Sequence, residues 1–311
     1  MASYFAIFLV VLSLGSGLIW LLDATVFAPK RRERLVAAEA EAGGELGEDA
    51  SDAILRQSAI AETAQSIFPI VLLITLFRSF LYEPFQIPSS SMLPTLLVGD
   101  FILVNKYSYG VKDPVWRKQL IDVGEPARGD IAVFKYPENE KQDFIKRVIG
   151  LPGDTIIYRN KKLFIQPSCD KNPEKCERPQ QIEPEIVNSD EFEVRGIPLV
   201  RLKEDLLGEK THDILLAPVY MMDEAKEFYR QHSSGEVGKW VVPKDSYFVL
   251  GDNRDNSRDS RFWGFVHKDL LVGEAVFIWM SFEFPENGDD SWLPGFIPRG
   301  VRFERLGPLN D

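Results

Sequence analysis

The stretch Phe85-Gln86-Ile87-Pro88-Ser89-Ser90-Ser91-Met92-Leu93-Pro94-Thr95 places three consecutive serines between two prolines. Proline fixes φ and disfavours the helical conformation of the residue before it, so we expect an extended and rigid backbone here. A serine hydroxyl in this stretch would be exposed and held in one direction. A Pro/Ser cluster alone is also typical of an ordinary surface loop, so its meaning depends on the rest of the chain.

The sequence begins with a long apolar segment, well before the serine stretch. Residues 3–22 carry no charged side chain, and about 20 helical residues span a hydrocarbon core of about 30 Å. Basic residues follow at once, at Lys30, Arg31, Arg32 and Arg34, and such flanks mark the cytoplasmic side. A cleaved signal peptide is disfavoured, because no basic residue precedes the apolar run and no small-x-small site follows it. We therefore predict a first transmembrane helix in residues 1–22, with the N-terminus outside the cytoplasm.

A second apolar run leads directly into the serine stretch. It covers residues 63–82, where Arg78 can extend its charge to the interface and Tyr82 suits an interfacial position. The alternative is a buried core helix, because the strictly uncharged part is short. A second transmembrane helix is favoured, since the first needs a return partner. Residues 23–62 then form a cytoplasmic loop, Ala- and Glu-rich in its second half and predicted to be a solvated linker or loose helix, and residues 83–311 lie outside the cytoplasm.

The remainder of the chain is predicted to be mainly β. Short runs rich in Val, Ile, Phe and Tyr are separated by Gly, Pro, Asn and Asp, and they occupy residues 100–107, 130–136, 143–149, 154–158, 162–165, 247–250 and 273–284. Arg159-Asn160-Lys161 is typical of a hairpin turn. Residues 166–239 are more polar and less regular, which indicates an insertion or smaller subdomain on the β core.

Composition excludes several classes of protein. The 311 residues carry a formal net charge of −11, which argues against nucleic acid as a partner. The two cysteines, Cys169 and Cys176, are too few for a closed zinc site, and no metal or cofactor is expected. Their spacing suits a disulfide in an oxidising compartment, although two unrelated exposed thiols remain the alternative.

A lysine in one predicted strand is a candidate general base. Strand alternation sends Phe144, Lys146 and Val148 to one face and leaves Arg147 on the other, with Asp143 nearby as a possible partner. Apolar neighbours disfavour the ammonium form, so the pKa of Lys146 should fall towards the range of a general base. An edge lysine that extends into solvent is the alternative.

A second polar motif, residues 251–264, is dense in Asp, Asn and Ser, a composition that locks a loop through side-chain turns. We expect it to present Ser257, with Asp259 and Arg261 paired as a brace. The three histidines, His212, His232 and His267, lie outside the informative motifs. A Ser-His-Asp triad therefore has little support, whereas a Ser-Lys dyad follows the same logic.

The three motifs together resemble the bacterial type I signal peptidases. The resemblance rests on residues 88–95, 146–154 and 251–257, in this order after two transmembrane segments. It implies that Ser91 is the nucleophile, Lys146 the general base and Ser257 a hydrogen-bond partner that positions Lys146. It also implies that Ser89 donates to the oxyanion. Ser90 stands where the family most often has glycine, so the residues alone leave the choice among the three serines open.

The resemblance implies a serine endopeptidase that removes signal peptides from secretory preproteins after small-x-small sites, through an acyl-enzyme. Its expected place is the bacterial inner membrane, as a monomer in contact with lipids and with its catalytic domain on the periplasmic side. Shallow apolar walls for the substrate are expected from Phe85, Ile87, Pro88 and Ile145. A membrane-anchored β-rich binding module without enzymatic activity is the alternative function. Residues 38–43 also offer small-x-small spacing, which suggests self-cleavage in detergent.

Overall fold

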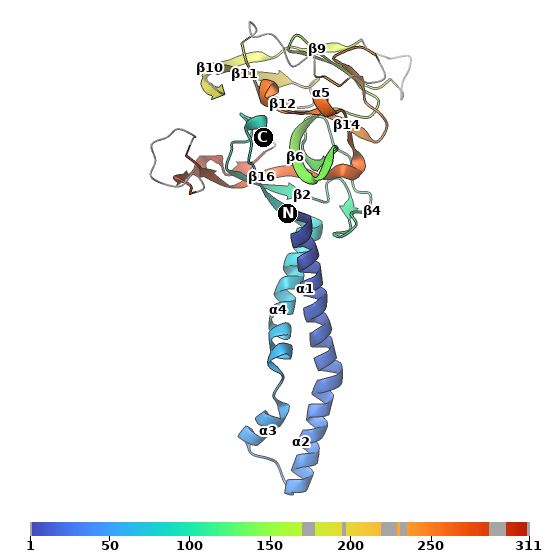
Figure 1. Ribbon diagram of the computed structural model, residues 1–311, viewed down its shortest axis with the longest axis vertical. Coiled ribbons are helices and arrows are strands. Elements are labelled where there is room, and N and C mark those ends of the chain that lie inside the picture. The colour runs from blue at the N-terminus through green and yellow to red at the C-terminus, as the bar shows by residue number, and fades with distance from the viewer. Residues whose placement is uncertain are drawn as a thin grey trace. The chain divides into compact units, whose positions relative to one another are not determined.

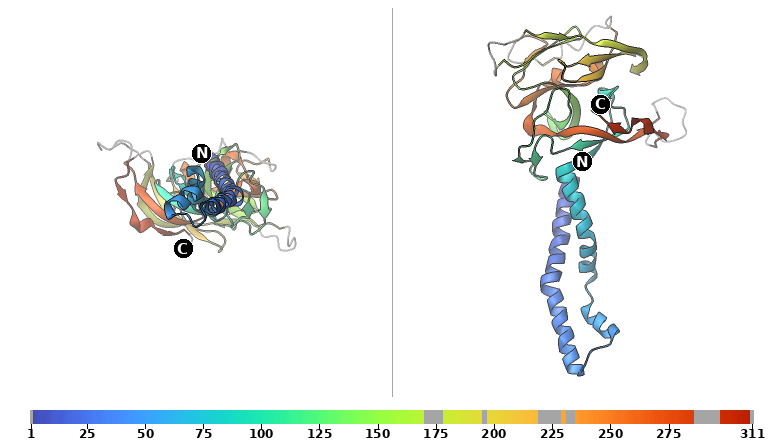
Figure 2. Two further views of the ribbon diagram at one scale, coloured as in Figure 1. Left: turned by 90° about the horizontal axis from the view of Figure 1, so that it is seen from below. Right: turned by 180° about the vertical axis from the view of Figure 1, so that it is seen from behind.

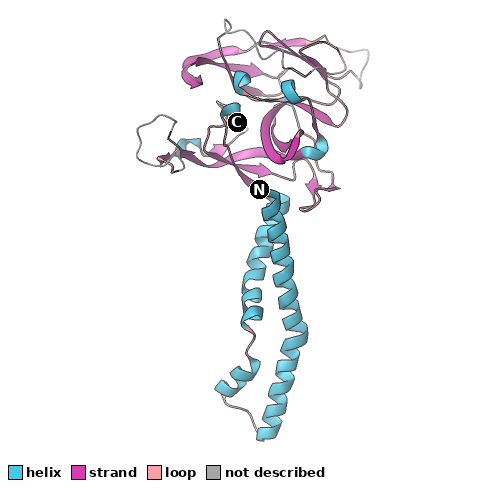
Figure 3. Cartoon of the chain, in the orientation of Figure 1, coloured by secondary structure: helices cyan, strands magenta, loops and turns pink. Residues whose placement is uncertain are grey.

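The computed structural model describes residues 2–169, 178–194, 197–218, 229–230, 235–285 and 297–309. The chain forms two compact units, one of residues 1–81 and 113–117 and one of residues 82–112 and 118–311. Helices build the first unit and strands dominate the second (Figure 3). The prediction of a mainly β protein with two apolar N-terminal helices is confirmed.

The helical unit is a long antiparallel pair. Helices α1 (Ala2–Leu22) and α2 (Ala28–Ala42) are continuous through a π-helical stretch, and α4 (Ala59–Leu76) likewise continues to Leu81. Helices α1 and α4 lie side by side (Figure 1), and Ser13 Oγ and Thr75 Oγ1 are 2.8 Å apart across them. By length and composition, the helices Tyr4–Ala42 and Ala59–Leu81 can each cross a membrane.

Both helices extend beyond the apolar runs that identified them. The predicted loop, residues 23–62, is largely helical, because Ala and Glu are good helix formers: it contains α2, α3 (Glu48–Leu55) and the start of α4. The small-x-small stretch at residues 38–43 forms the last turn of α2, which Gly43 terminates in the left-handed conformation with φ of 73°.

The β-rich unit is built on one large sheet. Its strands run in the order β1-β2-β16-β5-β6-β14-β15, and β17 and β18 also pair with β16. The sheet strands are β1 (Tyr82–Gln86), β2 (Asp100–Asn105), β5 (Ile131–Tyr136), β6 (Asn139–Gly150), β14 (Ser246–Leu250), β15 (Val266–His267), β16 (Leu271–Glu283), β17 (Gly300–Val301) and β18 (Gly307–Pro308). Figures 1 and 2 show β16 as a long strand through the middle of this unit.

Three smaller sheets complete the unit. They are β10-β11-β12, β13-β7-β8-β9 and β3-β4, formed by β3 (Val111–Lys112), β4 (Gln119–Ile121), β7 (Thr155–Arg159), β8 (Lys162–Gln166), β9 (Gln180–Ile182), β10 (Glu185–Val194), β11 (Ile197–Asp205), β12 (Thr211–Leu216) and β13 (Lys239–Val241). The expected turn between β7 and β8 is present, with Asn160 and Lys161 at φ of 50° and 61°, the left-handed values that a two-residue hairpin turn requires. A short helix, α5 (Ser260–Trp263), lies at the end of the second polar motif.

The segment 166–239 is less separate than the sequence indicates. It supplies β10, β11 and β12, which form a sheet of their own, but its β9 pairs with β8 of the neighbouring sheet. Residues 118–311 accordingly belong to one compact unit. Cys176 lies outside the described residues, so its pairing with Cys169 stays a prediction.

The two faces of β6 pack into two different core clusters, as strand alternation predicts. Phe144 and Val148 pack in a cluster with Trp263. Ile145 packs in another with Ile87 and Met92. Strand β6, which contains Lys146, therefore lies between two apolar clusters.

Candidate active site

Ser91 lies in the segment that connects β1 to β2. Ser90, Ser91 and Met92 form one turn of 3-10 helix, and the Ser91 side chain is buried. The backbone N–H of Asn253 donates to the Ser91 carbonyl at 3.1 Å. This contact ties the serine stretch to the second polar motif.

Ser90 has a different environment from Ser91. Its hydroxyl accepts a hydrogen bond from Asn256 Nδ2 at 2.8 Å, and its carbonyl accepts one from Asn253 Nδ2 at 3.1 Å. The Ser90 side chain thus serves as an anchor for the loop. Of the two neighbours, only Ser91 contacts a lysine.

Lys146 is that lysine. Its Nζ donates to Ser91 Oγ at 2.7 Å and to the carbonyl of Ile145, also at 2.7 Å. The side chain is buried, and the ring of Phe144 is centred 5.6 Å from the ammonium. Burial lowers the pKa of Lys146 to about 8, against the opposing attraction of Asp259 and Asp252. A lysine in this state can exchange a proton with the adjacent hydroxyl near neutral pH.

Ser89 lies next to the pair on the exposed side. Its Oγ is 3.4 Å from Ser91 Oγ. At this distance its hydroxyl can reach an oxygen that develops on a carbonyl bound at Ser91. The structure therefore brings Ser89, Ser91 and Lys146 together.

The second polar motif reaches the pair because β14 pairs with β6. Leu250 is opposite Arg147 in this antiparallel ladder, so the loop that begins at Gly251 starts beside Lys146. The expected brace is present: Arg261 Nε donates to Asp259 Oδ1 at 2.8 Å, and Gly251 N–H donates to Asp259 Oδ2 at 3.0 Å.

Ser257 does not make its expected hydrogen bond. Its hydroxyl is buried and has no partner among the described residues, so the bond to Lys146 is absent from this structure. The ammonium is already engaged by Ser91 and by the Ile145 carbonyl. Ser257 nevertheless lies close by, because a Cβ added at Gly251 would be 2.2 Å from Ser257 Oγ and 2.6 Å from the Ser91 carbonyl oxygen.

The prediction that Asp143 is the partner of Arg147 was wrong. Arg147 donates to both oxygens of Asp252, at 2.8 and 2.6 Å, while Asp143 pairs with Lys135 at 2.7 Å. Thr95 also donates to Asp252, at 2.5 Å. The strand pairing of β6 with β14 explains this choice, because it brings residue 252 next to Arg147.

Two buried residues of the segment 166–239 support the same motif, and the sequence interpretation missed them. Glu204 receives two hydrogen bonds from Arg254, at 2.8 and 2.5 Å. His212 Nε2 lies 3.8 Å from Asp252 Oδ1. Burial, reinforced by the charges of Arg147 and Arg254, holds the pKa of His212 well below its ordinary value. The polar, irregular sequence around these residues carried no signal of this role.

Three of the four candidate wall residues share one core cluster. Ile87 is buried in it, and the half-buried Phe85 and Ile145 pack against it. Pro88 is exposed between Ile87 and Ser89. Within the described ranges, no group of three or more His, Cys, Asp or Glu side chains could hold a metal ion.

Comparison with known proteins identifies the family of this chain. A family model described as "Signal peptidase, peptidase S26" matches residues 60–280. The chain belongs to this family. Signal peptidase I of Buchnera aphidicola subsp. Acyrthosiphon pisum (strain APS) is 38% identical to it over 100% of both chains. Signal peptidase I of Pseudomonas fluorescens is 39% identical over 97% of this chain and 99% of its own.

A crystal structure of a signal peptidase I from Enterococcus faecalis V583 also matches, at 24% identity over 49% of this chain and 98% of that one. Its TM-score is 0.26, too low to support a comparison of folds. The family assignment, which confirms the resemblance seen in the three motifs, therefore rests on the sequence matches.

Proposed function

We propose that this chain is a membrane-anchored serine endopeptidase that removes signal peptides from secretory preproteins, with Ser91 and Lys146 as a catalytic dyad. One observation carries the proposal: Lys146 Nζ is 2.7 Å from Ser91 Oγ, and burial lowers the pKa of this lysine to about 8. Membership of the signal peptidase family supports the substrate class. The relatives named signal peptidase I support it further.

The chemistry follows from the geometry. Neutral Lys146 takes the proton of Ser91 as Oγ attacks the scissile carbonyl carbon, and then gives it to the amine that leaves. The resulting ester on Ser91 is hydrolysed by a water molecule that gives its proton to Lys146, which returns it to the serine. The Ser91 N–H and the Ser89 hydroxyl would stabilise the oxyanion, and the loss of one such donor typically costs about 100- to 1000-fold in rate.

Substrate is expected to lie extended and to pair with a strand edge. Phe85 and Ile145 would admit only small substrate side chains, which agrees with cleavage after a small-x-small site. In the chain, Ser91 follows the helix end at Leu81 by ten residues. A bond near the end of a lipid-embedded signal peptide would thus be within reach of a catalytic domain on the periplasmic side of the inner membrane. The protein is expected to act there as a monomer in contact with lipids.

The test is cleavage of a purified secretory preprotein by the detergent-solubilised chain. We expect Ser91→Ala and Lys146→Ala each to lower kcat/KM by at least about 1000-fold, since each removes a group that acts in the transition state. The matched control is Ser90→Ala, which removes a neighbouring hydroxyl and its bond to Asn256. It should keep activity within about tenfold, because a typical hydrogen bond contributes about 1 kcal/mol.

Cleavage by Lys146→Ala at the parent's rate would contradict the assignment of the base. Loss of activity in Ser90→Ala with retention in Ser91→Ala would contradict the assignment of the nucleophile. Parent chain that binds a preprotein and never cleaves it would favour the non-enzymatic binding module.

A further inference from the structure

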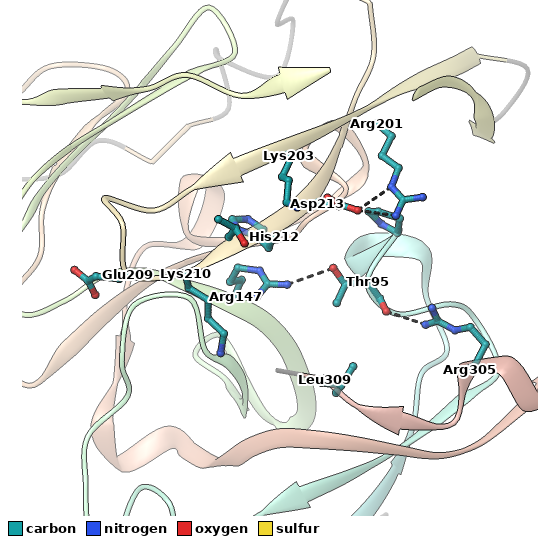
Figure 4. Close-up of a pocket in the computed structure, with 12 residues that line it drawn as sticks. Thr95, Arg147, Arg201, Lys203, Glu209, Lys210, His212, Asp213, Arg305 and Leu309 are labelled. Carbon is teal, nitrogen blue, oxygen red and sulfur yellow. Dashed lines mark hydrogen bonds and ion pairs between the residues drawn. The ribbon is translucent and has the colours of Figure 1, made fainter. Parts of the chain in front are cut away.

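A cavity of about 520 Å³ adjoins the network beneath the catalytic pair. Arg147 and Thr95 line it, and both also bind Asp252. Because neighbouring residues of a strand point to opposite faces, Arg147 faces this cavity while Lys146 faces Ser91. Figure 4 shows that the lining comes from separate parts of the chain, with strands β11 and β12 on one side and the C-terminal segment at Arg305 and Leu309 on another.

The lining of this cavity is strongly cationic in a chain of net charge −11. Five basic side chains line it, namely Arg147, Arg201, Lys203, Lys210 and Arg305. Two acidic side chains face them, Asp213 and Glu209. Asp213 pairs with Arg201 at 2.6 Å, and Glu209 pairs with Arg128 at 3.2 Å.

Asp130 lies 3.9 Å from the lining residue Lys210, and two further acids lie behind the lining. Asp252 is 1% exposed beneath Arg147, and Asp100 is fully buried 2.6 Å from Arg305. These carboxylates hold the guanidinium groups in place and do not line the cavity themselves. The cavity is therefore lined by guanidinium and ammonium donors whose charges are partly balanced, and Lys203 is the lining cation that has no ion pair within the described ranges.

A buried histidine in the wall lacks hydrogen-bond partners. His212 is 7% exposed, and neither of its ring nitrogens has a hydrogen-bond partner within the described ranges. A buried polar group without a partner is costly. Nε2 lies 3.6 Å from Glu204 Oε2 and 3.8 Å from Asp252 Oδ1, so the basic side chains, and not the imidazole, are the donors that a ligand in the cavity would reach.

We propose that this cavity binds the phosphate group of a small phosphate ester or diester. Phosphate oxygens accept several charged hydrogen bonds at once, and arginine forks and lysine ammoniums are the side chains that recognise them. The volume lies within the range of small-ligand sites, about 300–1,000 Å³. The apolar part of the lining is limited to Pro94 and Leu309, which offers little to an apolar peptide side chain. The site does not require Ser91, so it is independent of the proposed peptidase function.

The phosphate could belong to a soluble compound or to a lipid headgroup, and two probes distinguish these sources. Sodium pyrophosphate and the short-chain lipid dihexanoyl phosphatidylglycerol are each titrated by calorimetry into the full chain in a non-ionic detergent, without phosphate buffer. Binding of pyrophosphate alone indicates a soluble phosphate, and binding of the lipid alone indicates a headgroup. Binding of both at one site indicates that the phosphate itself is recognised, and binding of neither overturns the proposal.

Lys203 provides the decisive variant. Its side chain is exposed on β11 and has no part in the proposed catalytic machinery, so Lys203→Glu should fold. We expect Lys203→Gln to weaken binding of the active probe roughly tenfold, as loss of one charged hydrogen bond does, and Lys203→Glu to abolish it. The matched control is Lys162→Glu, which reverses an exposed lysine on β8 that does not line the cavity.

Equal loss in Lys203→Glu and Lys162→Glu would mean that net charge alone attracts the anion, and would overturn the proposal. Unchanged binding in Lys203→Glu would do the same. Circular dichroism checks that each variant is folded. If Lys203→Glu does not fold, Lys203→Gln still provides the test.

Discussion

A lysine acts as a base near neutral pH only when its ammonium form is destabilised, and burial does this to Lys146. The apolar surroundings lower its pKa, while Asp259 and Asp252 attract the ammonium and limit the shift to a value of about 8. About one lysine in ten is then neutral at pH 7. The proposed dyad thus depends on a balance between desolvation and two buried carboxylates.

The absence of a side chain at Gly251 leaves room for Ser91 and Ser257 to pack beside it. An added Cβ would lie 2.6 Å from the Ser91 carbonyl oxygen, which is backbone and cannot rotate away. We expect Gly251→Ala to lower cleavage activity by at least about 100-fold, because a displacement of catalytic groups by about 1 Å has that cost. Preprotein cleavage measures it.

The matched control is Gly307→Ala, where an added Cβ meets nothing within 4 Å. It should retain the parent's activity and thermal stability. Full activity in Gly251→Ala would show that Ser91 and Ser257 are less closely packed than the structure indicates.

At the level of single residues, the sequence predicted the properties that depend on residues nearby in the chain. Lys146 could be predicted to have a lowered pKa from strand alternation alone, because its apolar neighbours are two residues away. The partner of Arg147 could not be predicted, because Asp252 is 105 positions further along the chain. The absence of a hydrogen bond between Ser257 and Lys146 could not be predicted either, because it depends on which acceptors the Lys146 ammonium already contacts.

At the level of elements, the loop that carries Ser257 is held from both sides. Strand β14 delivers it next to β6, and the sheet of β10, β11 and β12 holds its outer side through Glu204 and Arg254, which form a pair that is almost fully buried. Leu215 of β12 adds a backbone hydrogen bond to the Asp252 carbonyl at 2.9 Å. This sheet therefore contributes directly to the geometry of the site.

We expect Glu204→Gln to destabilise the protein by about 3 kcal/mol, since breaking a buried ion pair leaves an uncompensated charge. The melting temperature in detergent should fall by several degrees, and cleavage activity should fall with it at temperatures where the protein is still folded. The matched control is Glu236→Gln, which removes one partner of an exposed ion pair with Arg159.

Glu236→Gln should melt with the parent, because exposed pairs contribute little. If the two variants melted at the same temperature, the buried pair would not be what holds the loop.

The existence of most strands was predictable from runs of β-branched and aromatic residues, whereas their pairing was not. Residues 247–250 and 143–149 were both recognised as strands, yet nothing local indicated that they would be neighbours. Strands β10 to β12 escaped prediction because polar side chains interrupt their pattern, and their role became visible only through Glu204 and His212.

At the level of the whole molecule, the proposed membrane topology rests on two apolar helices that are long enough to cross a membrane and on the charges beside them. Four basic residues in α2 predict that the linker lies in the cytoplasm, and the proposed topology puts the N-terminus and residues 83–311 outside it. We expect a membrane-impermeant maleimide to label Lys162→Cys in intact spheroplasts, and Asp52→Cys only after permeabilisation. Both variants are made in a background with Cys169 and Cys176 replaced by alanine.

Labelling of Asp52→Cys in intact spheroplasts would reverse the assigned topology. The two long apolar helices could be predicted from the sequence, because hydropathy is read without knowledge of tertiary contacts; that both cross the membrane stays a prediction.

The most direct test of the dyad is the rate at which a serine-directed acylating probe modifies Ser91, followed by peptide mass spectrometry between pH 6 and 10. We predict that Ser91 alone among the three serines is acylated, at a rate that rises with pH and is half-maximal near 8 as Lys146 loses its proton. Lys146→Ala should show no such labelling. Acylation of Ser91 at the parent's rate in Lys146→Ala, or a rate independent of pH in the parent, would contradict the account.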